Sequence, residues 1–168
     1  MPSSRCSDTR QRSTGIVCDS TSTSSPLRTR LLVADERRPR GLLDTSVVID
    51  LERLDPSALP LESAISAITL AELAAGPHAT SDPDERARRQ DRLQRVEAVF
   101  DALPFDAEAS RAYGRVYAAV ASAGRTARGA RAVDLMIAAT ASALDLPLYT
   151  RNPDDFRALN HLIEVVAL

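Results

Sequence analysis

The sequence predicts an α/β fold: a three-layer sandwich with a central, mainly parallel sheet of about five strands. Short apolar runs typical of buried strands alternate with longer segments of helical periodicity along most of the chain. Strands separated by helices favour parallel pairing, because a parallel connection needs a crossover of that length. The 168 residues, 44% of them hydrophobic, are enough for one domain with a packed core.

The strand-like segments are short, and each follows or precedes a polar turn. We expect them at residues 42–43, 64–68, 147–150 and 163–166. The helix-like segments carry apolar side chains three and four positions apart. We expect them at residues 47–54, 69–75, 84–103, about 106–123 and 133–144. The last is apolar on almost every side and rich in alanine, which predicts a helix buried against the sheet.

Residues 1–40 are predicted to be a disordered tail rich in Ser, Thr and Arg, and residues 41–168 to be the folded domain. Only the apolar stretch 31–34 in the tail is expected to be able to pair with the sheet. The composition of the tail also resembles that of a transit peptide, but an idle extension is the preferred interpretation. Cys6 and Cys18 both lie in this tail without partners at metal spacing, so we expect no disulfide framework and a reducing, cytoplasmic location.

Charge and hydropathy exclude several classes of function. The formal net charge is only -2, so no global basic field indicates nucleic acid. The chain contains no lysine, which excludes mechanisms that need a catalytic or phosphate-binding lysine. No run approaches the roughly 18 apolar residues of a membrane span, and no membrane partner is expected.

Four acidic residues occur where the predicted strands end or the following helices begin. They are Asp44, Glu72, Asp134 and Asp155. Functional groups of parallel sheets collect at the carboxyl ends of the strands, so we expect these four side chains to converge. Converging carboxylates repel one another unless a cation lies among them, and oxygen ligands suit Mg²⁺ or Mn²⁺.

Each acid also has a purely structural interpretation. Asp44 and Asp134 could cap the helices that follow them, and Glu72 could form a capping box with Thr69. Asp155, or its neighbour Asp154, could be a turn residue after a proline. Taken singly, each of these interpretations is favoured; the four acids together favour a metal site.

The four acids lie in four short motifs that follow one another along the chain. The motifs are Leu-Leu-Asp44-Thr-Ser, Ile68-Thr-Leu-Ala-Glu72-Leu, Asp134-Leu-Met-Ile-Ala-Ala-Thr-Ala and Thr150-Arg-Asn-Pro-Asp-Asp155-Phe. In this order they resemble the PIN-domain nucleases, and more narrowly the VapC-type toxins of bacterial toxin–antitoxin pairs. The resemblance covers residues 41–168. Asp155, which directly precedes Phe156, matches the fourth acid better than Asp154 does.

The resemblance implies an Mg²⁺- or Mn²⁺-dependent endoribonuclease that is neutralised by a cognate antitoxin and forms a homodimer. Asp44, Glu72, Asp134 and Asp155 would then be both the catalytic residues and the ligands of one or two metal ions. Chemistry supports this assignment independently, since a bound metal would lower the pKa of a water and neutralise developing charge. Thr45, Ser46 and Asn152 are expected to orient ligands or substrate, although helix capping explains the first two equally well.

Arginines supply the remaining candidate contacts. Arg125, Arg128 and Arg131 lie in a glycine-containing loop that leads into Asp134, with no acid between them, and are candidates for phosphate contact. The arginines of residues 84–103 are interspersed with acids and indicate a solvated helix face. His78 and His161 are isolated, which disfavours a histidine nuclease or a zinc site.

Two alternatives stay open at this stage: an RNA-processing PIN nuclease without an antitoxin, and a non-catalytic RNA-binding module. The presence of all four acids argues against the second. A phosphoacceptor signalling domain is excluded, because it needs paired acids after the first strand and a lysine late in the chain.

Overall fold

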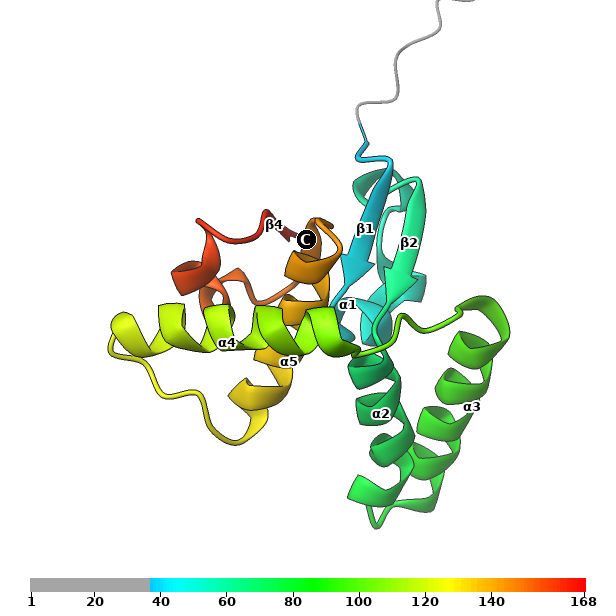
Figure 1. Cartoon of the computed structure of the whole chain (residues 1–168). Helices are drawn as coiled ribbons and strands as arrows, with labels where there is room; N and C mark the ends of the chain where they lie inside the picture. Colours follow the sequence, from blue (N-terminus) through cyan, green and yellow to red (C-terminus); the bar gives the residue numbers. More distant parts are fainter. Residues whose placement is uncertain (1–36) are drawn as a thin grey trace, which may run out of the picture. The chain divides into compact units, whose positions relative to one another are not determined.

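The computed structural model describes residues 37–168, which form a parallel sheet covered by helices (Figure 1). The strands are β1 (Arg40–Leu43), β2 (Glu62–Ile65), β3 (Leu148–Thr150) and β4 (Val165–Ala167), in the spatial order β2-β1-β3-β4. All three pairings are parallel. The α/β class and the parallel sheet are therefore confirmed.

The helices follow the predicted order. They are α1 (Thr45–Asp50), α2 (Ala67–Ala75), α3 (Pro83–Val99), α4 (Ala107–Ser122) and α5 (Ala130–Ala143). Five short 3₁₀ turns lie between them: η1 (Leu51–Arg53), η2 (Pro56–Ala58), η3 (Gly76–Ala79), η4 (Pro153–Asp155) and η5 (Arg157–Leu159). Within residues 37–168, no helix is both long and apolar enough to cross a membrane.

The expected number of about five strands was slightly too high, since the described part of the chain has four. One further extended residue, Leu103, forms an isolated parallel bridge with Ser66 at the β2 edge. The next residue is Pro104, which has no backbone N–H to continue a ladder. The stretch 31–34, expected to be able to pair with the sheet, and nearly all of the predicted tail lie outside the described residues. The predicted domain boundary at residue 41 falls inside β1.

Several predicted element boundaries were wrong. The predicted helix 47–54 ends at Asp50, where the 3₁₀ turn η1 follows, and α5 begins at Ala130 instead of residue 133. Two further errors involve residues that meet beside the junction of β2 and α2. The predicted strand 64–68 ends at Ile65, because the Ser66 hydroxyl caps α2 by accepting a hydrogen bond from the Thr69 N–H at 3.0 Å. The predicted helix 84–103 ends at Val99. Its last expected residue, Leu103, instead donates its N–H to the Ile65 carbonyl at 2.9 Å.

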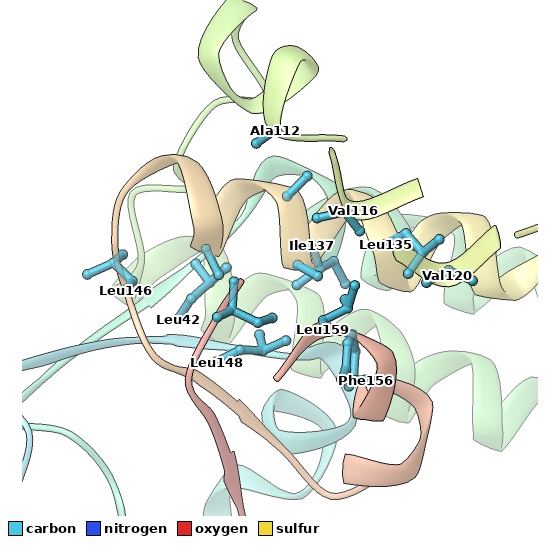
Figure 2. Packing of buried hydrophobic residues seen from close by; sticks show 14 residues of the cluster. Leu42, Ala112, Val116, Val120, Leu135, Ile137, Leu146, Leu148, Phe156 and Leu159 are labelled. Atoms are coloured by element: carbon cyan, nitrogen blue, oxygen red, sulfur yellow. The ribbon is translucent and has the colours of Figure 1, made fainter. Parts of the chain in front are cut away.

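Neighbouring residues of β1 point to opposite faces of the sheet and so belong to different core clusters. Leu42 packs in the cluster built with α4 and α5, which Figure 2 shows together with Leu148 and Phe156. Leu43 packs in the other cluster, which is built with α1, α2 and α3. The sheet is thus the middle of three layers. Helix α5 has the predicted burial, with its central residues Ile137 to Ala141 buried.

Candidate active site

The four candidate acids lie near the carboxyl ends of β1 and β3. Asp44 directly follows β1, and its N–H donates to the carbonyl of Tyr149 in β3 at 2.9 Å. Glu72 lies in α2, Asp134 in α5 and Asp155 in η4, just after β3. Two helices and two strand ends from distant parts of the sequence therefore supply the cluster.

Asp44 is the most enclosed of the four, with 5% of its surface exposed. Its Oδ2 accepts hydrogen bonds from the Ser46 hydroxyl at 2.7 Å and from the buried Thr150 hydroxyl at 2.8 Å. The Asn152 N–H donates to the Thr150 oxygen at 3.0 Å. Asp44 stands at the N-cap position of α1, but its side chain makes no capping hydrogen bond. The carboxylate is thus oriented by two hydroxyls and not by the backbone at the start of α1.

Glu72 is half-buried on α2 and accepts a hydrogen bond from the Thr45 hydroxyl, with 2.5 Å between the two oxygens. It takes no part in a capping box, because Ser66 caps the helix and Thr69 is the buried third residue inside it. The capping interpretation of Glu72 was therefore wrong. Its carboxylate is instead held towards α1.

Asp134 lies more than one turn inside α5, which begins at Ala130 after Gly129. It is too far along the helix to be an N-cap, so that alternative was also wrong. The described residues provide no hydrogen bond to its carboxylate. Burial, and then the negative charges of Asp44, Glu72 and Asp155, raise the pKa of Asp134 from 3.8 to about 6, while Arg131 opposes the shift.

Asp155 differs from the other three acids because a cationic side chain holds it. Its Oδ1 accepts a hydrogen bond from Arg131 Nη2 at 3.1 Å, and Arg131 Nη1 reaches its backbone carbonyl at 3.4 Å. The neighbouring Asp154 pairs with Arg157 at 2.8 Å and is exposed. Of these two aspartates, only Asp155 contributes to the raised pKa of Asp134. The geometry therefore favours Asp155 over Asp154 as the fourth acid.

Of the three predicted supporting residues, two contact the acids through their side chains and one does not. Thr45 and Ser46 each donate a hydrogen bond to an acid of the cluster. The side chain of Asn152 is exposed and makes no such contact, and only its backbone N–H joins the network, through Thr150. Sequence reasoning missed Thr150. Its signal is a polar residue at the end of the apolar strand β3, next to the strand that carries Asp44.

The loop arginines are less free than the sequence suggests. Arg131 pairs with Asp155, and Arg125 donates to the Asp154 carbonyl at 2.9 Å. The interpretation that all three are unopposed was therefore wrong for Arg131. Arg128 is exposed and has no hydrogen-bond or ion-pair partner within residues 37–168.

The donor set fits a hard divalent cation by its chemistry, because all four groups are carboxylates and their mutual repulsion is visible at Asp134. In the part of the chain from residue 37 onwards, however, no three acidic, histidine or cysteine side chains are already grouped closely enough to hold a metal. Asp155 in particular is directed to Arg131. Ligation by several of these acids therefore requires the side chains to close around the ion.

A family model described as the PIN domain matches residues 41–162. The chain therefore belongs to the PIN-domain family, whose VapC-type nucleases are in general metal-dependent.

Within the family, the chain is similar to two proteins named as VapC ribonucleases. It is 41% identical to Ribonuclease VapC5 of Mycobacterium tuberculosis over 123 residues, which are 71% of this chain and 87% of the relative. It is 30% identical to Ribonuclease VapC of Rickettsia bellii over 125 residues, which are 72% of this chain and 91% of the relative.

The fold is likewise similar to a chain in the crystal structure of VapBC-5, a toxin–antitoxin system member from Mycobacterium tuberculosis. The TM-score is 0.68 at 38% sequence identity, and the match covers 77% of this chain and 99% of the other. The predicted resemblance to VapC-type PIN domains is confirmed.

Proposed function

We propose that the chain is a metal-dependent endoribonuclease that acts as the toxin of a toxin–antitoxin pair. The observation that carries the proposal is the convergence of four carboxylates at the ends of β1 and β3. Burial and the charges of the other three acids raise the pKa of Asp134 to about 6. The VapC ribonucleases to which the chain is similar support the same activity. Cellular RNA as substrate places the proposed action in the cytoplasm.

In this proposal Asp44, Glu72, Asp134 and Asp155 hold Mg²⁺ or Mn²⁺. When bound, the metal supplies an activated water and compensates the charge that develops on the scissile phosphate. Ser46 and Thr150 hold the Asp44 carboxylate, and Thr45 holds that of Glu72, so both face the cluster in one orientation. Asn152 is left as a candidate for substrate contact, since its side chain is exposed.

RNA also needs cationic contacts outside the acid cluster, because four carboxylates repel a phosphate backbone when no metal is bound. Arg125 and Arg128 in the loop before α5, and Arg131 in the first turn of α5, remain our candidates for phosphate contact. Arg128 is the best placed of the three, because neither a carboxylate nor a carbonyl occupies its guanidinium. Arg131 is better suited to hold Asp155.

The proposed partners are a cognate antitoxin protein and a second copy of the chain in a homodimer. The similar chain of known structure comes from a complex described as a toxin–antitoxin system. An RNA-processing nuclease with the same site would have no antitoxin. A small reading frame next to the gene, if one is found there, separates the two by co-expression of its product: a toxin is inhibited in a stable complex, whereas a processing enzyme is not.

Cleavage of RNA by the purified chain tests the activity itself. We expect cleavage with Mg²⁺ or Mn²⁺ that EDTA stops. Asp44→Ala, Glu72→Ala and Asp134→Ala should each abolish it, since each removes an oxygen ligand from a metal held by few protein groups. His161→Ala, a change at an exposed residue with no hydrogen bond or ion pair to the four acids, serves as a preparation control. Undiminished cleavage by the Asp44→Ala protein would disprove the assignment.

A further inference from the structure

Helix α3 contains five arginines, and four of them form hydrogen bonds or ion pairs with other residues of the protein. Arg86 donates to the Thr80 carbonyl, Arg88 and Arg89 both pair with Glu85, and Arg95 pairs with Glu52. Arg92 makes neither a hydrogen bond nor an ion pair within residues 37–168. The solvated, charge-balanced helix face expected from the sequence therefore accounts for four of the arginines. It does not account for the fifth, Arg92, which has no partner within residues 37–168.

Arg92 lines a groove of about 280 Å³ that reaches the acid cluster. The groove also contains Thr45 and Glu72, which are hydrogen-bonded to each other, and the apolar side chains of Ile49 and Leu73. Ile49 is 44% exposed although it lies in α1, the helix that directly follows Asp44. One continuous surface thus joins a proposed metal ligand, an apolar patch and an unoccupied guanidinium.

Apart from Glu72, whose partner is the neutral Thr45 hydroxyl, the other charges in this groove are already compensated within the protein. Glu85 is held by Arg88 and Arg89, and Arg89 also donates to the Gly76 carbonyl at 3.0 Å. Arg92 is half-buried, so its aliphatic stem is packed while its five N–H donors stay unused. A planar guanidinium with free donors matches two oxygens of a phosphate and costs little entropy to order when its stem is already held.

We propose that Arg92 binds a backbone phosphate of single-stranded RNA, one or more nucleotides from the phosphate that is cleaved at the acids. Ile49 would contact the ribose or base between them. The inference rests on the proposed function and extends it by naming a substrate subsite. In Figure 1, α3, which contains Arg92, and the loop before α5, which contains Arg128, lie on opposite sides of α2.

Binding of a fluorescent single-stranded RNA oligonucleotide to the full chain in EDTA tests this contact without cleavage. Arg92→Gln should weaken binding about three- to tenfold and reduce the salt slope by about 0.7, the value for one phosphate contact on a single strand. Arg88→Gln is the matched control, because it removes the same charge from the same helix at a paired position. It should leave both quantities unchanged. Arg92→Lys should keep the slope and lose part of the affinity, since an ammonium lacks the two-pronged geometry.

Equal effects of Arg92→Gln and Arg88→Gln would overturn the inference, because they would show a general charge effect. It would also be overturned if Arg92→Gln left RNA binding intact and weakened only the complex with the antitoxin, since the groove would then be a protein interface. Metal-dependent cleavage by the parent is measured separately. A parent that cleaves RNA while Arg92→Gln behaves like the parent refutes the subsite alone; a parent that never cleaves refutes the proposed function.

Discussion

The two halves of the acid cluster hold their carboxylates by different chemistry. On the side of β1 and α2, Asp44 and Glu72 accept hydrogen bonds from the neutral hydroxyls of Ser46, Thr150 and Thr45. On the side of α5 and η4, Asp155 pairs with the guanidinium of Arg131, and Asp134 has no hydrogen bond within the described residues.

This difference explains why the repulsion within the cluster raises the pKa of Asp134 in particular. Hydroxyls orient a carboxylate and leave its charge in place for a cation, whereas a guanidinium neutralises it. Asp134 receives neither kind of contact, so burial and the charges of the other three acids act on it almost unopposed and raise its pKa to about 6. The first half therefore keeps two oriented negative charges, and in the second half Asp134 bears the effect of burial and of its charged neighbours.

The largest expected effect is that of Asp44→Asn on catalysis. The substitution keeps the shape and the hydrogen-bond acceptor but removes the ligand charge, so cleavage should fall by at least about a hundredfold. Added Mg²⁺ should raise the melting temperature of the parent more than that of the variant, because only binding to the folded state stabilises it. Equal metal responses in thermal melts would show that Asp44 does not contribute to a metal site.

A smaller loss is expected when Asp44 keeps its charge and loses a hydroxyl. Thr150→Val removes the buried donor to Asp44 Oδ2 without changing the volume of the side chain. Metal affinity should fall about 10- to 100-fold, as is usual for a group that orients a ligand. Thr150→Ser retains the hydroxyl and should keep most of the affinity. If Thr150→Ser lost as much as Thr150→Val, packing rather than the hydrogen bond would be responsible.

Asp134→Asn should stabilise the metal-free protein, and the gain should depend on pH. The folded-state pKa of Asp134, about 6, lies above its ordinary value, so the charged form is disfavoured in the fold. Near pH 4 and below, the penalty is absent; it grows up to about pH 6 and is complete above that. A shift of this size would be about 3 kcal/mol for a fully buried group, and solvent screening of the half-buried Asp134 reduces it to about 1–2 kcal/mol.

Thermal melts in EDTA should show this gain as roughly 2–8 °C at pH 8 and almost nothing at pH 4. Asp44→Asn should gain less at pH 8, because two charge-assisted hydrogen bonds become weaker neutral ones while the repulsion is relieved. If Asp44→Asn raised the melting temperature more than Asp134→Asn did, the repulsion would be larger at Asp44 than at Asp134. That result would contradict the comparison of the two halves.

The smallest effect is expected from the ion pair of the second half. Arg131→Gln should lower the stability of the metal-free protein by less than about 1 kcal/mol, since the two side chains are 26% and 39% exposed. Arg128→Gln is the control: it removes an arginine three residues earlier that has no hydrogen-bond or ion-pair partner within residues 37–168, and it should leave stability unchanged. Chemical denaturation at low and high salt distinguishes them, because only the Arg131 contribution should shrink as salt increases.

The sequence by itself determined the order of strands and helices and the positions of the four acids within them. Those features follow from local periodicity and residue type, which any short window contains. It also indicated the family, because four motifs in order constrain the chain more than any one of them does. The end of β2 was missed for an equally local reason: Ser66 reads as a strand residue until its hydroxyl is seen to cap α2.

Only the tertiary structure decided which groups hold each acid. Thr150 reaches Asp44 across 106 residues, Thr45 reaches Glu72 across 27, and Arg131 reaches Asp155 across 24. The same is true of Arg92, which, unlike the other arginines of α3, forms no hydrogen bond or ion pair within residues 37–168. Such contacts depend on where the backbone brings distant residues together. The sequence shows that a hydroxyl or a guanidinium is present, but it does not show which residue that group will contact.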